Sequence, residues 1–197
     1  MKAAAIILSG GKSSRMGTNK ALLKINEKTN IERIRDRLQP FFSDMILVAN
    51  NQDDYRFLEI NMTADRYPGM GPLAGVHAGL SATHQETNLI VACDMPFVSA
   101  ELAQALVEKC SGYDAVVPVI HGKQHPLFAV FHKRILPIVE DCLKNGDLRM
   151  KHLFERLHVL YVTEKDLGGF DDLEKIFFNM NHPSEYDEAL KRAEEGK

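Results

Sequence analysis

Glycines, hydroxyl groups and cations gather in one short segment near the start of the chain. The segment Ser9-Gly10-Gly11 directly follows the apolar run 3–8, and Arg15 and Lys20 lie a few residues further on. Paired glycines after a strand let backbone amides approach an anion without obstruction by a Cβ atom. The two cations add the charge that phosphate groups attract. The pattern predicts a site for a polyphosphate chain, and the alternative is a solvated Gly/Ser turn with surface cations.

The fragment Gly11-Lys12-Ser13 looks like the end of a Walker-type phosphate loop, but its spacing is wrong. That loop needs a glycine five residues before its Gly-Lys-Ser/Thr, because the backbone between them wraps a phosphate. The position in question holds Ile6, in the middle of the apolar run. We therefore predict a phosphate-binding segment of another kind.

Polar side chains also follow later apolar runs. Asp94 comes directly after the run 88–93, and the following Met95-Pro96 ends a strand. A carboxylate at such an edge suits Mg²⁺, which binds one or two carboxylates together with substrate phosphates. A turn or helix-cap aspartate is the alternative. Other polar residues that stand at the end of an apolar run are Asn50, Asp65, Asn179 and Asn181.

A second glycine pattern, Gly69-x-Gly71-x-x-Ala74, matches a relaxed dinucleotide-binding fingerprint, and Asp94 lies ~20 residues further on, where an acidic ribose ligand is expected. That fingerprint should close the first strand of its unit, but here the first strand ends in the Ser9-Gly10-Gly11 segment. Pro72 also removes an amide where phosphate would need one. A helix that begins at Pro72 explains the pattern better than a dehydrogenase does.

Apolar runs of strand length alternate with helical patterns along the whole chain, which is typical of a mostly parallel sheet covered on both faces. We predict a single-domain, three-layer α/β/α Rossmann-like fold over residues 1–197, with ligands at the carboxyl ends of the strands. The expected strands are 3–8, 45–49, 61–65, 88–93, 114–119, 127–131, 158–162 and 176–180. The expected helices are 30–42, 72–82, one from Ser99 onward, 134–144 and 183–194, with a loop at 167–172.

The composition excludes several classes of partner. The formal net charge is −3, which argues against a general affinity for nucleic acid or anionic membranes. The three cysteines lack the spacing of a zinc site or a redox pair, which favours a reducing compartment. No signal peptide or membrane-spanning run is evident, so we expect a cytoplasmic protein.

Residues 8–20, LSGGKSSRMGTNK, resemble the signature Leu-x-Gly-Gly-x-Ser-x-Arg-Met-Gly-x-x-Lys of enzymes that transfer a nucleoside monophosphate. Among these nucleotidyltransferases the chain is most similar to the molybdenum cofactor guanylyltransferases. Four further segments resemble that family in the same order, so the resemblance spans nearly the whole chain. They are YPGMGPLAG at 67–75, ACDMP at 92–96, HPL at 125–127 and FNMNHP at 178–183.

Three positions depart from the family pattern. Ser9 replaces a more usual alanine, Asn19 stands where an aspartate often precedes the lysine, and His182 replaces a threonine. We expect the change at Ser9 to matter little if the nucleotide contacts only backbone atoms there. None of the three removes a predicted cation or the predicted metal carboxylate.

The resemblance implies that the protein transfers GMP from GTP to molybdopterin, releases pyrophosphate and forms the molybdopterin guanine dinucleotide cofactor. It further implies a nucleotide-binding half (1–100), an acceptor-binding half (101–197) and transient contact with cofactor-biosynthesis proteins or molybdoenzymes. Alternatives that share most motifs are a cytidylyltransferase acting on the same pterin or on another phosphorylated acceptor. A non-catalytic nucleotide-binding protein of the same fold is the third possibility.

The roles of single residues follow from this resemblance. The catalytic candidates are Arg15 and Lys20, which would neutralise charge on the α-phosphate and pyrophosphate, and Asp94, which would hold Mg²⁺. The predicted nucleotide-binding residues are Leu8, Ser9, Gly10, Lys20, Asp65 and Asp94. We expect Asn179 and Asn181 to contact the acceptor, with a turn role as the alternative. The basic group Arg149, Lys151 and His152 could receive an anionic acceptor or be solvated surface, and His125 could be a base or a loop residue.

Overall fold

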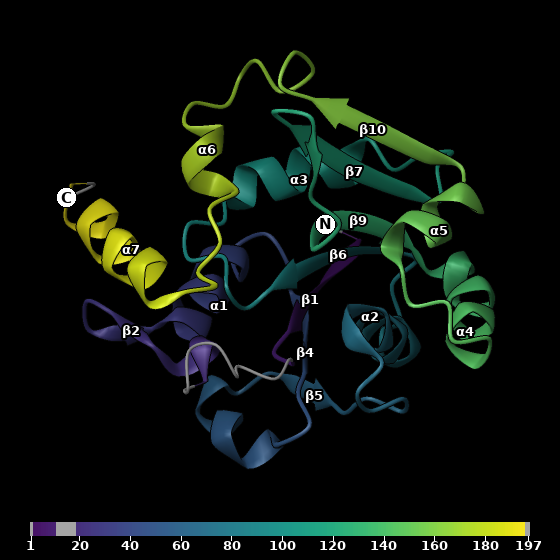
Figure 1. The fold of residues 1–197 in the computed structure, drawn as a ribbon, viewed down its shortest axis with the longest axis horizontal. Helices are drawn as coiled ribbons and strands as arrows, with labels where there is room; N and C mark the ends of the chain where they lie inside the picture. The colour runs from purple at the N-terminus through teal and green to yellow at the C-terminus, as the bar shows by residue number, and fades with distance from the viewer. Residues whose placement is uncertain (1, 11–18, 196–197) are drawn as a thin grey trace.

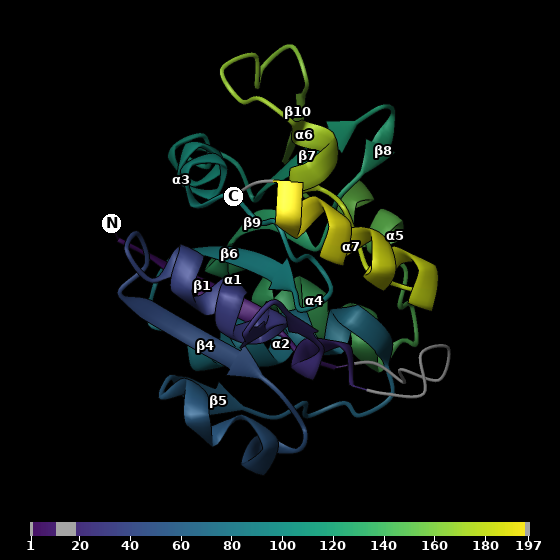
Figure 2. The ribbon, with the colours of Figure 1, turned by 90° about the vertical axis from the view of Figure 1, so that its left-hand side faces the viewer.

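A mixed sheet runs through the middle of the molecule, and helices cover both of its faces (Figures 1 and 2). The structure is a computed structural model and describes residues 2–10 and 19–195. In spatial order the strands are β10 (Val159–Thr163), β7 (Ala115–Ile120), β9 (Phe128–His132), β6 (Thr87–Ala92), β1 (Ala3–Leu8), β4 (Asp44–Val48) and β5 (Asn61–Thr63), and the short β8 (Lys123–Gln124) pairs with β7.

Four strands of this sheet, β1, β4, β5 and β6, form a parallel block. β1 pairs in parallel with β4 on one side and with β6 on the other, and β4 pairs in parallel with β5. The antiparallel β9 joins this block to β7, with which β10 pairs in parallel. The mostly parallel sheet that the alternating apolar runs predict is confirmed.

The helices separate into two layers. α2 (Gly71–Ala82), α4 (Leu136–Lys144) and α5 (Met150–Glu155) pack on one face of the sheet, and α1 (Asn30–Leu38) and α3 (Ala100–Glu108) pack on the other (Figure 1). Successive residues of β1 serve opposite layers, because side chains alternate along a strand. Ile7 joins the core with α1 and α3, whereas Ile6 and Leu8 join the core with α2 and α4.

Local signals in the sequence account for how several helices begin. Thr29 and Glu32 form a reciprocal capping box at the start of α1, and Ser99 caps α3 by accepting a hydrogen bond from the Leu102 amide. α2 carries Pro72 in its first turn, where the missing amide costs no helical hydrogen bond. The helix predicted from Pro72 is therefore confirmed.

One predicted strand is wrong. Residues 176–180 form no strand; the chain makes the short helix α6 (Leu173–Ile176), continues as irregular backbone and enters α7 (Pro183–Glu195). The apolar side chains here are buried in different places, because Phe177 belongs to the core under α3 whereas Met180 packs with Phe97 and Ile25. Burial at separate sites, and not pairing in a sheet, explains the apolar pattern.

Several short elements give no periodic signal in the sequence and were not predicted. They are the hairpin β2 (Lys24–Ile25) and β3 (Lys28–Thr29), the helix α5, and the 3₁₀ helices η1 (Lys20–Leu22), η2 (Gln52–Leu58) and η3 (Lys133–Ile135). In the described part of the chain, no helix is both long and apolar enough to cross a membrane.

Candidate active site

The carboxyl ends of β1 and β6 lie side by side at the point where the strand order reverses. From β1 the chain adds β4 and β5 on one side, and then returns to place β6 on the other side (Figure 1). The pairing continues past the strand ends, because the Ser9 amide donates to the Val48 carbonyl at 2.9 Å and the Cys93 amide to the Leu8 carbonyl at 3.0 Å. Ligands of open α/β sheets bind at such a reversal.

Asp94 extends from the end of β6 with its backbone fixed on both sides. The buried Asn30 side chain donates to the Cys93 carbonyl at 2.6 Å, and the Met180 amide donates to the Asp94 carbonyl at 2.9 Å. Burial raises the pKa of the Asp94 carboxyl group, and the nearby Lys20 ammonium partly opposes that shift. The carboxylate therefore stands in a site that favours an additional positive charge.

Lys20 is placed by the 3₁₀ helix η1. The side chain of Asn19 caps this helix by accepting a hydrogen bond from the Ala21 amide at 3.1 Å. The Lys20 ammonium then donates to the Asn181 side-chain oxygen at 3.0 Å. The Lys20 ammonium, which follows the glycine-rich segment, thus contacts the C-terminal segment beside Asp94.

Leu8, Ser9 and Gly10 stand where the prediction needs them, at the end of β1. Leu8 is buried in the α2 layer, Ser9 is half-buried and Gly10 is exposed. Among the described residues, no atom lies within 4 Å of the position that a Cβ at Gly10 would take. The other predicted cation, Arg15, lies outside the described residues.

The side chain of Ser9 has a role that the sequence did not reveal. Its hydroxyl donates to the Tyr55 hydroxyl at 2.6 Å, and the Asn19 amide donates to the same oxygen at 2.7 Å. Tyr55 belongs to η2 and is 3% exposed. The expectation that the side chain at position 9 matters little is therefore incomplete.

Asp65 stands past the end of β5, on the other side of the site. Its backbone amide donates to the side chain of Asn50 at 3.0 Å. Its Oδ1 is buried without a hydrogen-bond partner among the described residues, and burial raises the pKa of the carboxyl group. This oxygen is therefore suited to accept a hydrogen bond from a donor group of a ligand.

The two asparagines of the C-terminal segment differ in their surroundings. Asn181 contacts Lys20, and its backbone amide donates to the Glu185 carboxylate, which also accepts from the His182 amide at 2.8 Å. Asn179 has a buried side-chain oxygen with no partner among the described residues. The strand predicted for residues 176–180, at whose end these asparagines would stand, is absent, because this backbone is irregular.

His125 is buried against the core. Its ring centre lies 4.4 Å from that of Phe177, and the Phe128 amide donates to its carbonyl. Burial lowers the pKa of His125 to about 4, so the imidazole is neutral near pH 7. These contacts favour the structural role of His125 over that of a base.

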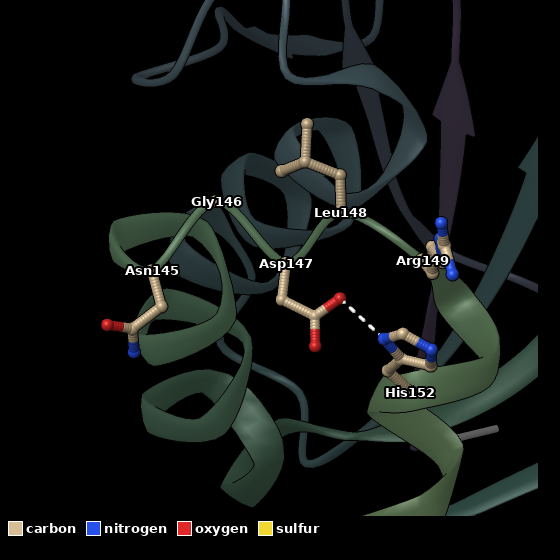
Figure 3. A pocket seen from close by; sticks show the side chains of 6 residues that line it. All are labelled: Asn145, Gly146, Asp147, Leu148, Arg149 and His152. Carbon is tan, nitrogen blue, oxygen red and sulfur yellow. Dashed lines mark hydrogen bonds and ion pairs between the residues drawn. The ribbon is translucent and has the colours of Figure 1, made fainter.

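Two members of the basic group in the C-terminal half, Arg149 and His152, line a separate hollow between α4 and α5 (Figure 3). The hollow has a volume of about 530 Å³, and its lining includes Arg149 and His152 but none of the predicted nucleotide-site residues. His152 Nδ1 lies 2.8 Å from Asp147 Oδ1, so one ring nitrogen of this histidine already has an aspartate as its partner. The exposed Lys151 does not line it.

The donor set fits a magnesium ion that is shared with a substrate. Among the described residues no three histidine, cysteine or acidic side chains form a group that could hold a metal. Mg²⁺ needs fewer protein ligands than that, because it keeps waters and binds one or two carboxylates plus phosphate oxygens. Asp94 supplies one carboxylate at the place where the phosphates would lie.

Comparison with known proteins agrees with this geometry. Residues 5–160 match the model of the "MobA-like NTP transferase domain". A "Probable molybdenum cofactor guanylyltransferase" of Pelotomaculum thermopropionicum is 36% identical over 100% of this chain and 96% of its own length. One of the same description from Carboxydothermus hydrogenoformans is 38% identical, over 94% of this chain and 93% of its own.

Solved structures show the same fold. The crystal structure of "Molybdopterin-guanine dinucleotide biosynthesis protein A" from Archaeoglobus fulgidus has a TM-score of 0.85 at 28% identity, and covers 98% of this chain and 99% of its own. A cytidylyltransferase from Thermus thermophilus has a TM-score of 0.72 at 16% identity over 96% and 98% of the two chains, a likeness of fold alone. Given the match to the family model over most of its length, the chain belongs to the MobA-like NTP transferase family of nucleotidyltransferases.

Proposed function

We propose that the protein is a guanylyltransferase that transfers GMP from GTP to molybdopterin. The observation that carries the proposal is the meeting of Lys20, Asp94 and Asn181 at the ends of β1 and β6. The names of its relatives at 36% and 38% identity indicate the same reaction. The product is the molybdopterin guanine dinucleotide cofactor.

The reaction is a displacement at phosphorus. The terminal phosphate of molybdopterin forms a bond to the α-phosphorus of GTP, and the bond from that phosphorus to the β-phosphate oxygen breaks and releases pyrophosphate. Negative charge accumulates on the leaving group, and a cation fixed beside it lowers the barrier. Lys20 serves in this role, with Arg15 as the second cation of the same segment.

Nucleotidyltransferases generally use a divalent metal, and Mg²⁺ is the ion proposed here. Asp94 would hold it with its carboxylate, and the bound ion would neutralise charge on the phosphate oxygens. The hydrogen bonds from Asn30 and Met180 to the carbonyls of Cys93 and Asp94 fix the backbone that presents this carboxylate.

The nucleotide lies in the half formed by residues 1–100, against the backbone of Leu8, Ser9 and Gly10. Asp65 contacts the base or the ribose. Its Oδ1, which has no hydrogen-bond partner in the described part of the chain, is an acceptor, and this suits guanine because that base presents donors at both N1 and N2. The half formed by residues 101–197 receives the acceptor through Asn179 and Asn181.

We also propose that the protein acts in the cytoplasm, with GTP and molybdopterin as substrates. Cofactor-biosynthesis proteins or molybdoenzymes make transient contact to deliver the pterin or receive the product. Neither nucleic acid nor a membrane takes part.

Pyrophosphate release tests the proposal. The protein is incubated with Mg²⁺ and either GTP or CTP, with and without molybdopterin. We expect release only with GTP and molybdopterin together. Release with CTP in place of GTP would identify a cytidylyltransferase, and nucleotide binding without release under any condition would identify a binding protein.

A further inference from the structure

The buried hydroxyl of Tyr55 joins two distant parts of the nucleotide site. It accepts a hydrogen bond from the Ser9 hydroxyl at 2.6 Å and from the Asn19 side-chain amide at 2.7 Å. Ser9 is 46 positions and Asn19 is 36 positions away in the sequence, so both contacts come from the tertiary fold. A tyrosine oxygen has two lone pairs and can serve both donors.

Each of the two donors is attached to a different side of the site. Ser9 continues the end of β1, where its amide is held by the Val48 carbonyl at 2.9 Å. Asn19 caps η1, whose first residue is Lys20. The Tyr55 hydroxyl therefore ties the backbone at Ser9 to the helix that presents the Lys20 ammonium.

The ring of Tyr55 makes this tie rigid. Tyr55 is 3% exposed and packs in the core that Ile7 and Leu58 share. Burial raises the pKa of its hydroxyl, so the group is neutral at physiological pH. The packed ring therefore holds its neutral hydroxyl in one position, where it accepts hydrogen bonds from both donors.

We infer that Tyr55 is a positioning residue for the triphosphate, one that sets the separation between the Ser9 backbone and the Lys20 ammonium. This inference rests on the proposed function. Tyr55 acts through Ser9 and Asn19 and needs no contact with the nucleotide. Its loss should weaken nucleotide binding more than it slows the chemical step, because the two sides of the site lose their common anchor before substrate arrives.

The test replaces Tyr55 by phenylalanine, which keeps the ring and removes the hydroxyl. We expect the Kd for GTP with Mg²⁺, and the KM for GTP, to rise roughly tenfold, while kcat falls less. The matched control is Tyr186→Phe, which removes a tyrosine hydroxyl bond of 2.6 Å to the Lys24 carbonyl. The control should bind GTP as the unaltered protein does.

A double-mutant cycle separates positioning from general stability. Ser9→Ala removes one of the two donors and should raise the Kd for GTP by about threefold. If Tyr55 acts through Ser9, Tyr55→Phe should weaken GTP binding less in the Ser9→Ala background than in the unaltered protein. A purely structural role predicts that the two effects on binding add.

The outcomes are distinct. Unchanged GTP affinity in Tyr55→Phe, or full additivity with Ser9→Ala, would overturn the inference. If Tyr55→Phe does not fold, Ser9→Ala carries the test alone, and unchanged affinity in it would equally overturn the inference. Failure of the unaltered protein to bind GTP or release pyrophosphate would instead refute the proposed function.

Discussion

The Asp94 carboxyl group occupies a position where its ionised form is disfavoured in the folded protein. Burial raises its pKa, and the opposing effect of Lys20 does not cancel the shift. Active sites often hold charged groups at a cost in stability, because substrate or metal supplies the missing partner. Asp65 shows the same feature at the other side of the site: its pKa is raised, and its buried Oδ1 has no partner within residues 2–10 and 19–195.

Asp94→Asn should separate activity from stability. We expect kcat to fall roughly 10²–10³-fold, because the carboxylate that we propose as the metal ligand is lost. A raised pKa means that ionisation favours the unfolded chain, so this substitution should raise Tm at pH 7. The gain should vanish below about pH 3.9, where the carboxyl group is protonated in both states.

Pyrophosphate release and thermal unfolding at pH 7 and pH 3 measure the two effects. Turnover in Asp94→Asn within a few-fold of the unaltered protein would contradict the assigned role. A lower Tm at pH 7 would contradict the account of the pKa.

His125 should contribute to pH dependence of stability and not to catalysis. Its pKa falls to about 4 because the ring is buried. The unfolded chain therefore takes up a proton first as the pH drops below about 6.5, and stability is lost between that pH and about 4. In His125→Gln, the free energy of unfolding should depend less steeply on pH in this window, while turnover at pH 7 remains.

Urea unfolding at pH 7 and pH 5 gives the slope of the free energy of unfolding against pH. The control is His84→Gln, at a histidine that is exposed. The control should keep the slope of the unaltered protein. A large loss of kcat at pH 7 in a folded His125→Gln would show that the histidine acts in the reaction.

At the scale of elements, the close approach of α2 to β1 places the site. A Cβ built on Gly79 would lie 2.3 Å from Cγ2 of Ile6, far inside contact distance. A Cβ on Gly75 would lie 3.2 Å from Cδ2 of Leu8, which is the end of a flexible side chain. The helix can therefore lie directly against β1, the strand that leads into Ser9 and Gly10.

Overpacking in Gly79→Ala should cost about 1–3 kcal/mol. The gain in helix propensity of about 1 kcal/mol offsets part of this cost, so we expect a net destabilisation of up to about 2 kcal/mol. Gly75→Ala should cost less. Urea unfolding measures both, and Gly79→Ala should be better tolerated in an Ile6→Ala background, where the clashing atom is absent. Equal costs for the two glycines would contradict this packing.

At the scale of the whole molecule, the sequence predicts strands and helices with a periodic apolar pattern. It does not predict features that depend on contacts between distant segments. The run 3–8 is apolar at every position, and it forms an interior strand whose side chains are buried on both faces of the sheet. The apolar residues at 176–180 gave a similar signal, yet Phe177 and Met180 are buried in separate clusters.

The candidate site divides in the same way. Ser9, Lys20 and Asp94 could be chosen because they follow strands or carry the charge that phosphate needs. Tyr55 could not, because η2 has no periodic pattern and its bonds to Ser9 and Asn19 appear only in the folded chain. The contact of Asn181 with Lys20, 161 positions away, is likewise a product of topology.

The rate of pyrophosphate release in Lys20→Met, with GTP, Mg²⁺ and molybdopterin, tests the central claim most directly. The exposed Lys24 provides the control Lys24→Met. If the Lys20 ammonium stabilises the departing pyrophosphate beside Asp94, Lys20→Met should react roughly 10²–10³-fold more slowly than the unaltered protein, and Lys24→Met at the unaltered rate. Equal rates in the two variants would contradict the account.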